Sequence, residues 1–304
     1  MNMTTINYST FTAYTENSSL TDLTAYTKNP SLADSPHRIA LISIYTVVLL
    51  VGSVGLIVMV NMLKTNLRSW TTIAFLNLLL AHFIFMLTIP FRIHYSVTNK
   101  WTLSQPFCKM VSAMIHLHMY LVFVIYTVIL TIRFLQYFKK IDRTEFYRRL
   151  HALAASVGIW SILIIIGPII LSQYGSNGNK DKCFNFGGAI KGAALALNIV
   201  LSVLILLVSC MLSCALGVIL YSIIKMHGAA CRDQQEFWAQ MKSVSLILII
   251  FTCLVPYHLF RLYYLHNPTV MQEDNEVFLA ITTLTCFDML LTFAGKGICY
   301  MCKC

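Results

Sequence analysis

The sequence predicts an all-α membrane protein, a seven-transmembrane helix bundle with an extracellular N-terminus and a cytoplasmic C-terminus. Of its 304 residues, 58% are hydrophobic and only 11% are charged, whereas roughly 25% of residues are charged in soluble globular domains. Seven apolar runs are long enough to cross a bilayer, because a spanning helix needs about 20 mostly apolar residues. The runs are Ile39–Leu63, Thr71–Ile93, Met110–Gln136, His151–Leu171, Ala189–Ile224, Ser243–Leu265 and Val277–Phe293.

These runs divide the chain into three parts. In hydrocarbon every backbone polar group needs a partner within a helix or a closed barrel, and the runs lack the alternating pattern of barrel strands. Residues 38–294 are therefore expected to form one helical transmembrane domain. Residues 1–37 are polar and rich in Ser, Thr and Asn, which predicts a disordered extracellular tail without a cleavable signal peptide. Residues 295–304 are expected to form a short cytoplasmic tail.

Charge and glycosylation signals predict the orientation of the bundle. With the N-terminus outside, the cytoplasmic segments hold 13 Lys and Arg against 4 Asp and Glu, and the extracellular segments hold 9 against 7. This bias follows the positive-inside rule, so the net charge of +10 indicates membrane topology rather than nucleic acid binding. The extracellular tail also carries three predicted glycosylation acceptors, which are Asn2, Asn7 and Asn17.

The cysteines agree with this orientation. Of ten cysteines, only Cys108 and Cys183 fall in extracellular segments outside the predicted spans. Two cysteines in an oxidising compartment are expected to pair, so they predict a disulfide bond. Three other cysteines follow the last span, namely Cys299, Cys302 and Cys304. Their juxtamembrane position favours S-palmitoylation, with free cysteines as the alternative, and a zinc site is disfavoured because no fourth ligand is near.

Short motifs occur in a fixed order along the predicted spans. They are Leu76-Asn77-Leu78-Leu79-Leu80-Ala81 and Leu87-Thr88-Ile89-Pro90-Phe91 in the second span, Trp101 before Cys108, Arg133 at the inner end of the third span, Trp160 in the fourth, Tyr221 in the fifth, Cys253-Leu254-Val255-Pro256-Tyr257-His258-Leu259-Phe260-Arg261 in the sixth and Cys286-Phe287-Asp288-Met289-Leu290-Leu291-Thr292-Phe293 in the seventh. Their order and spacing over residues 38–304 resemble the rhodopsin-like (class A) G-protein-coupled receptors. The Pro256-Tyr257-His258 run with Arg261 is similar to the purinoceptor-related branch, which binds nucleotides, lipid mediators and small carboxylates, and an orphan member of that branch is suspected.

The resemblance implies a multi-pass receptor of the plasma membrane that transmits an extracellular signal to heterotrimeric G proteins. Its expected ligand is small and either anionic or lipid. The family's usual switch residues are altered, however, while the scaffold is kept. The altered positions are Ile132-Arg133-Phe134 in place of an acid-Arg-Tyr triplet, Leu56 in the first span, His82 in the second, Ser213 in the fifth, Leu254 in the sixth, and Asp288 to Thr292 in place of the Asn/Asp-Pro-x-x-Tyr motif.

Five residues are expected to form the switch and to couple it to the G protein: Arg133, Tyr221, Glu236, Pro256 and Asp288. Pro256 interrupts the hydrogen bonds of the sixth span, so this helix either acts as a lever or carries a static kink. Arg133 is an ionisable residue at the inner membrane edge, where it is functional or merely extends to the interface. We predict that Arg133 pairs with Glu236 in the resting state, because Ile132 replaces the usual neighbouring acid.

Basic side chains near the outer ends of the spans predict an anion-binding pocket. Arg92, Lys109, Lys191 and Arg261 could converge there with Tyr257 and His258, and His116 is a further candidate. Guanidinium groups are rigid forks that fit phosphates and carboxylates. Arg261 is the strongest candidate because it lies one turn from His258 on the same helix face. The alternative is that these charges simply lie at the membrane interface. The other aromatic and Met residues of the third span, including His118, are expected to pack in the core.

The sodium site of rhodopsin-like receptors is expected to be altered. The resemblance implies that His82 replaces the sodium-binding aspartate and lies near Asp288 of the seventh span. Sodium prefers oxygen ligands, and a histidine that can itself become positive competes for the same place. Either a protonated His82 balances the Asp288 carboxylate, or both groups stay neutral and share a hydrogen bond. In both cases sodium binding should be lost.

The sequence favours a receptor over other classes of membrane protein. A transporter would tend to show internal repeats and matching broken helices, which this sequence lacks. An intramembrane enzyme is disfavoured because neither His-Glu-x-x-His nor Gly-x-Ser-x-Gly is present. No cofactor and no metal site are predicted. A receptor-like protein that signals constitutively, or only modulates partners, remains the alternative to a ligand-driven receptor.

Overall fold

The computed structural model describes most of the predicted transmembrane domain. The described residues are 36–63, 70–138, 156, 158, 160, 182–184, 192–228, 235–266, 270–288 and 290. Regular structure in these residues is helical throughout, which confirms the predicted all-α class. The predicted glycosylation acceptors Asn2, Asn7 and Asn17, the pocket residue Lys191, and the tail cysteines Cys299, Cys302 and Cys304 all lie outside the described residues.

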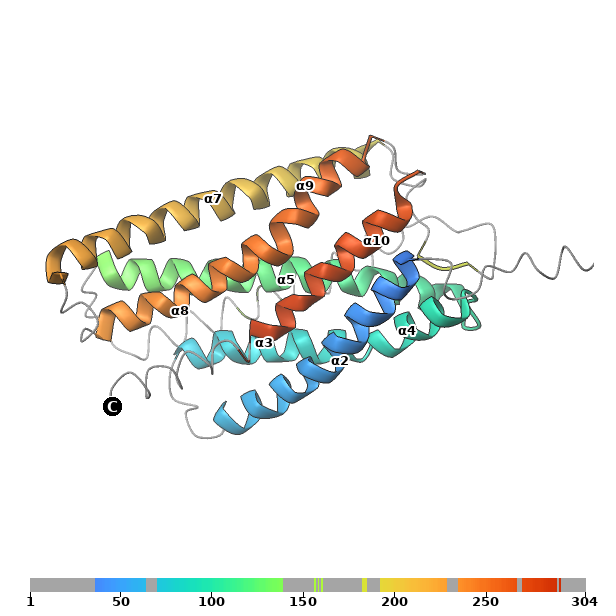
Figure 1. The fold of residues 1–304 in the computed structure, drawn as a ribbon, viewed down its shortest axis with the longest axis horizontal. Coiled ribbons are helices and arrows are strands. Elements are labelled where there is room, and N and C mark those ends of the chain that lie inside the picture. Colours follow the sequence, from blue (N-terminus) through green and yellow to red (C-terminus); the bar gives the residue numbers. More distant parts are fainter. Residues whose placement is uncertain are drawn as a thin grey trace, which may run out of the picture.

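Long helices lie side by side and form a bundle (Figure 1). In chain order they are α2 (Pro36–Leu63), α3 (Trp70–Met86), α4 (Ile89–Thr98), α5 (Gln105–Phe138), α7 (Ala193–His227), α8 (Gln235–Ile249), the π-helical turn η4 (Ile250–Leu254), α9 (Val255–Tyr264), α10 (Gln272–Ile281) and the 3₁₀ turn η5 (Thr282–Phe287). Helix α2 contacts α3, α4, α10 and η5, and α7 contacts α8 and α9. The first and last helices of the described chain therefore lie next to each other.

Five helical stretches of the described residues are long and apolar enough to cross a membrane. They are Pro36–Asn61, Ile73–Thr98, Gln105–Leu135, Leu195–His227 and Gln240–Tyr264. These stretches correspond to the first, second, third, fifth and sixth predicted spans. Of the fourth predicted span, His151–Leu171, the structure describes three residues only. Helix α10 and η5 run along the seventh predicted span, Val277–Phe293, as far as Phe287.

The second span is interrupted, although the sequence predicts one continuous helix over Thr71–Ile93. The structure ends α3 at Met86 and begins α4 at Ile89. Pro90 explains the break, because proline has no amide hydrogen and its ring clashes with the carbonyl one turn earlier. At the break, the Phe85 carbonyl accepts hydrogen bonds from the Thr88 amide at 2.9 Å and from the Thr88 hydroxyl at 2.7 Å. The backbone near the break is thus satisfied locally.

The sixth span is also divided, at the place where the sequence predicts a kink. The amide of Val255 bonds to the carbonyl of Ile250, which closes one wide π-helical turn. Pro256 follows in the first turn of α9, where a proline is tolerated because its missing amide hydrogen is not needed. Wide turns and prolines are the usual causes of helix bends. The sixth span therefore carries two such features side by side.

Helix α5 is the central helix of the described bundle. Figure 1 draws it in green between α7 and α3, and it contacts α3, α7, α8 and η5. Side chains at helical spacing along α5 are fully buried: Ile115, Met119, Val122, Tyr126 and Leu130. Large apolar side chains of α2 and α7 are exposed instead, among them Leu50, Val54, Ile57, Leu207, Met211 and Val218. Exposed apolar faces of this kind fit helices that contact lipid.

Candidate functional site

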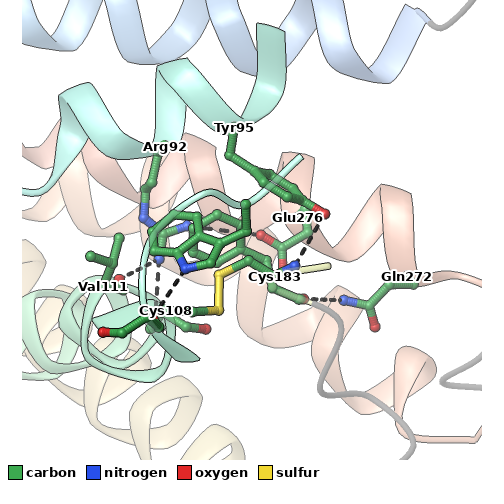
Figure 2. The surroundings of a disulfide bond; sticks show 11 residues. Arg92, Tyr95, Cys108, Val111, Cys183, Gln272 and Glu276 are labelled. Carbon is green, nitrogen blue, oxygen red and sulfur yellow. Dashed lines mark hydrogen bonds and ion pairs between the residues drawn. A yellow bond between two sulfur atoms is a disulfide. The ribbon is translucent and has the colours of Figure 1, made fainter. Parts of the chain in front are cut away.

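A disulfide bond lies at the end of the bundle that is predicted to be extracellular. Cys108, in the first turn of α5, is bonded to Cys183, and their Cα atoms are 5.9 Å apart. The predicted pair is therefore confirmed. The Cys183 amide donates a hydrogen bond of 3.3 Å to the Tyr95 hydroxyl, and Gln272 donates one of 3.0 Å to the Phe184 carbonyl (Figure 2). Residues 183–184 are thus held against α4, α5 and α10 at once.

Arg92 lies directly beneath this disulfide region, on α4. Its guanidinium group donates hydrogen bonds to the Val111 carbonyl at 2.8 Å and to the Tyr45 hydroxyl at 3.4 Å, and it lies 4.6 Å from the Phe184 ring centroid. Its Nη1 atom is 3.9 Å from Oε2 of Glu276, on α10 (Figure 2). The side chain is 98% buried, since its exposed fraction is 2%. Arg92 therefore holds a positive charge inside the bundle rather than at its surface.

Arg261 is a second buried arginine in the half of the bundle that is predicted to be extracellular. It lies on α9 and donates hydrogen bonds to the side-chain oxygens of Asn275, at 3.0 Å, and Asn198, at 3.1 Å. Its guanidinium carbon is 4.9 Å from the ring centroid of Tyr264. These two side chains are neutral amides on α10 and α7. Arg261 thus connects three helices through a charged group that is 5% exposed.

The two arginines belong to one electrostatic group. Glu276 interacts with Arg92 and with Arg261, and His116 of α5 interacts with Arg261, Arg92 and His258. His258 is fully buried, and its Nδ1 atom is 3.2 Å from the Ser202 hydroxyl. The structure therefore brings together four of the predicted pocket residues, which are Arg92, His116, His258 and Arg261.

Two other predicted pocket residues behave differently. Tyr257 is almost fully buried in the main apolar core, with its ring 5.1 Å from that of His258. It therefore lies on the inner face of α9 and contributes packing around His258. Lys109, on the first turn of α5, is only partly buried, so it is closer to the surface than the arginines.

A second polar cluster lies deeper in the bundle. His82 of α3 has its Nε2 atom 3.3 Å from the carboxylate of Asp288, which also accepts a hydrogen bond from the Tyr126 hydroxyl. On the other side of the ring, His82 Nδ1 is 2.8 Å from His118 Nε2 and 3.3 Å from Cys286 Sγ. All five side chains are buried. His82 thus stands beside Asp288, and the altered sodium site stays a prediction.

Three of the predicted switch residues, Arg133, Tyr221 and Glu236, lie toward the end of the bundle that is predicted to be cytoplasmic. Arg133 of α5 donates a hydrogen bond of 3.1 Å to the hydroxyl of Ser243 on α8. Glu236 is also on α8, but its side chain lies outside the described residues. Tyr221 is on α7 and is 67% exposed. Arg133 therefore contacts the helix predicted to carry its acidic partner, through a serine that the sequence did not single out.

Comparison with known proteins gives the class. Residues 54–291 match the family described as 7 transmembrane receptor (rhodopsin family). The chain belongs to this family of receptors and is thus a multi-pass plasma-membrane protein of the G-protein-coupled class.

Several curated relatives are themselves receptors. The chain is 39% identical over 273 residues to "Probable G-protein coupled receptor 141" of Homo sapiens, an alignment that covers 86% of this chain and 88% of the relative. It is 26% identical to "Probable G-protein coupled receptor 34" of Mus musculus, over 83% of this chain and 72% of the relative. It is 23% identical to "2-oxoglutarate receptor 1" of Rattus norvegicus, over 72% of this chain and 66% of the relative.

Several neighbours of the site were not identified from the sequence. Asn198, Ser202, Asn275 and Glu276 contact the pocket residues, but they stand on other helices, so no sequence spacing connects them to Arg92 or His258. Glu276 could have been identified as a candidate from the sequence, because an acid at the start of an apolar span is rare and needs a partner.

Proposed function

We propose that this receptor binds a small anionic ligand at its outer end and passes the signal to heterotrimeric G proteins. The observation that carries this proposal is the group of two buried arginines, Arg92 and Arg261, that both interact with Glu276. Two buried guanidinium groups in one part of the bundle favour an anionic ligand. A guanidinium group away from water binds carboxylates and phosphates in a defined geometry, with two parallel hydrogen bonds.

One relative supports the ligand class. The rat relative named "2-oxoglutarate receptor 1" is named for a dicarboxylate. A dicarboxylate has two anionic ends, which suits two arginines held on different helices, α4 and α9. Carboxylates and phosphates of small size are therefore the first compounds to try. The alternative is a receptor that signals constitutively or only modulates partners. The altered switch residues favour this alternative if no anion activates the receptor.

The helix that carries Arg261 also suggests how the signal would travel. Arg261 lies five residues after Pro256, and the wide turn η4 comes just before this proline. A ligand that pulls on Arg261 would move α9, and the bend would let α8 move at the inner end. There α8 carries Ser243, the partner of Arg133. Breaking this contact would open the inner end to the G protein.

Loss of the inner contact is expected to raise basal signalling. Ser243→Ala removes the hydroxyl that accepts the Arg133 hydrogen bond, and Glu236→Ala removes the predicted acidic partner. Removing the partner of a buried charge leaves that charge without compensation and destabilises the state that contained the pair. We expect higher ligand-free G-protein dissociation in both variants at matched surface expression. Ser245→Ala is the control, because the Ser245 hydroxyl donates its hydrogen bond to the Lys242 carbonyl of its own helix. Unchanged or lower basal signals in both variants would contradict a role for the Arg133 contact in holding the resting state.

Insensitivity to sodium is expected as well. His82 replaces one carboxylate of the expected sodium site and has nitrogen and sulfur neighbours beside the Asp288 carboxylate, whereas sodium prefers several oxygen ligands. Replacing sodium with a large organic cation at constant ionic strength should leave basal signalling and agonist affinity unchanged. His82→Asp should create sodium sensitivity where the remaining cavity permits it. A clear sodium effect in the unmodified receptor that Asp288→Asn removes would refute this interpretation of His82.

The proposal includes seven spans and an extracellular N-terminus. Residues 1–37 are the extracellular tail and residues 295–304 the cytoplasmic tail, with palmitoylation at Cys299, Cys302 and Cys304. Glycosidase treatment of the expressed receptor should increase its electrophoretic mobility, and replacing Asn2, Asn7 and Asn17 with Gln should remove that effect. A receptor whose mobility does not change with the glycosidase would contradict glycosylation of this tail.

A further inference from the structure

We propose that His82, His118 and Cys286 form a zinc-binding site inside the bundle. The side-chain atoms that could bind a metal, two imidazole nitrogens and one sulfur, all lie within 4.8 Å of one another, and all three residues are buried. They come from α3, α5 and η5, and α5 contacts both of the other elements. The proposal does not depend on the identity of the extracellular ligand.

The distances within the cluster are close to those that zinc needs. Zinc binds imidazole nitrogen at about 2.0 Å and thiolate sulfur at about 2.3 Å with tetrahedral angles, so the nitrogens should be about 3.3 Å apart and each about 3.5 Å from the sulfur. The nitrogens of His82 and His118 are 2.8 Å apart, and the Cys286 sulfur is 3.3 Å and 3.9 Å from them. A shift of about half an ångström, which rotation about side-chain bonds can supply, would therefore admit the ion.

The arrangement around His82 is the one that metal-binding histidines use. Such a histidine donates the N–H of its other ring nitrogen to a carboxylate, which fixes the ring and makes the binding nitrogen more basic. His82 has Nδ1 in the cluster and Nε2 only 3.3 Å from Asp288. Tyr126 donates a hydrogen bond to the same carboxylate and holds it in place. The ring of His118 is stacked on Phe85, 4.3 Å between centroids, and is thereby also fixed.

In the metal-free form, the donors and acceptors of this cluster cannot all form hydrogen bonds. Both His118 Nε2 and the Cys286 thiol approach the single nitrogen His82 Nδ1, which has one lone pair to accept a hydrogen bond when Nε2 carries the proton. His118 Nδ1 is buried without a hydrogen-bond partner among the described residues. A bound zinc ion would accept one lone pair from each of His82 Nδ1, His118 Nε2 and the Cys286 sulfur.

The chemistry of the donors selects the ion. Two neutral imidazoles and one thiolate suit zinc, whereas sodium, magnesium and calcium prefer oxygen ligands. On binding, the Cys286 sulfur exchanges its proton for the metal and the proton leaves to solvent, while His118 carries its proton on Nδ1. Three protein ligands leave a fourth position for water. The ion would tie α3, α5 and η5 together and stabilise the arrangement with these distances.

Zinc binding can be measured on the purified full-length receptor without any signalling assay. The tail cysteines Cys299, Cys302 and Cys304 are first replaced with Ser, so that they bind no zinc. After treatment with a chelator, the receptor is titrated with zinc against a competing chelator, and its zinc content is determined by elemental mass spectrometry. We expect one equivalent of zinc and a higher thermal-unfolding midpoint with the metal. Copper in place of zinc, or less than one tenth of an equivalent, would overturn the assignment.

Three variants and one control test the site. Cys286→Ser and His118→Phe should each weaken zinc binding at least tenfold, and His118→Phe keeps the stacking on Phe85. Asp288→Asn should weaken it about 10- to 100-fold, the usual effect of losing the carboxylate behind a metal-binding histidine. Cys253→Ser is the matched control, because Cys253 is a buried free cysteine outside the cluster.

Cobalt provides a test that needs no variant. Cobalt bound in place of zinc should show a sulfur-to-metal charge-transfer absorption in the otherwise unmodified protein, since Cys286 supplies a thiolate. This measurement tests the proposed site even when a variant does not fold. No such absorption in the cobalt-loaded receptor, or unchanged zinc affinity in Cys286→Ser, would overturn the proposal.

Discussion

Replacing either Cys108 or Cys183 with serine is expected to abolish surface expression of the receptor. The disulfide holds residues 183–184 against α4, α5 and α10, and Phe184 in turn covers the guanidinium of Arg92. Loss of such a bond typically costs about 2–5 kcal/mol in small secreted domains, which is a large part of a typical protein's stability. Surface labelling of an extracellular N-terminal epitope measures the result.

The control for this prediction is another cysteine of the same protein. Cys214 is an exposed free cysteine on α7, and Cys214→Ser should leave surface expression unchanged. The double variant Cys108→Ser/Cys183→Ser should be no worse than either single variant, because one bond is lost in all three cases. Normal expression of both single variants would show that the bond has no structural role.

Arg261→Ala is expected to weaken an anionic agonist at least tenfold, which corresponds to about 1.4 kcal/mol. Arg261 is buried on α9 and is positioned by Asn275 and Asn198, so its guanidinium has a fixed direction. Small carboxylates and phosphates, starting with 2-oxoglutarate, are the probes. Agonist potency is read from G-protein dissociation at matched surface expression.

Two comparisons separate a direct contact from a general loss of structure. Arg261→Lys keeps the charge but loses the fork of paired donors, so it should fall between the wild type and Arg261→Ala. Arg38→Ala removes another outer arginine, one that donates to the carbonyls of Ser96 and Val97, and should leave agonist potency unchanged. A cationic agonist that is indifferent to Arg261→Ala would contradict the anionic pocket.

The helices of the bundle could largely be predicted from the sequence. A bilayer requires about 20 apolar residues for each crossing, and this pattern is visible without any knowledge of packing. The interruptions at Leu87–Thr88 and Ile250–Leu254 were harder to predict. A proline indicates where a helix can bend, but neighbouring helices and side-chain hydroxyls decide whether it breaks, widens or continues.

The sites could be predicted only in part. Charge in an apolar segment identifies Arg92, Arg261 and Asp288, because such residues need a partner or a function. Which partner each one meets depends on which helix faces adjoin, and lipid-facing and core-facing positions are equally apolar here. The His118–Cys286 contact joins residues 168 positions apart. No spacing rule in the sequence could have revealed it.

Ligand-free G-protein dissociation in cells that express the double variant Ser243→Ala/Glu236→Ala tests the receptor mechanism most directly, because it requires no knowledge of the ligand. The assay is run with every class of Gα subunit, at verified surface expression, and beside the wild type and a cell without receptor. The account predicts stronger dissociation than the wild type with at least one Gα class, since Arg133 loses its hydrogen bond to Ser243 and its predicted partner Glu236. A double variant at the cell surface that is indistinguishable from receptor-free cells with every Gα class would contradict it.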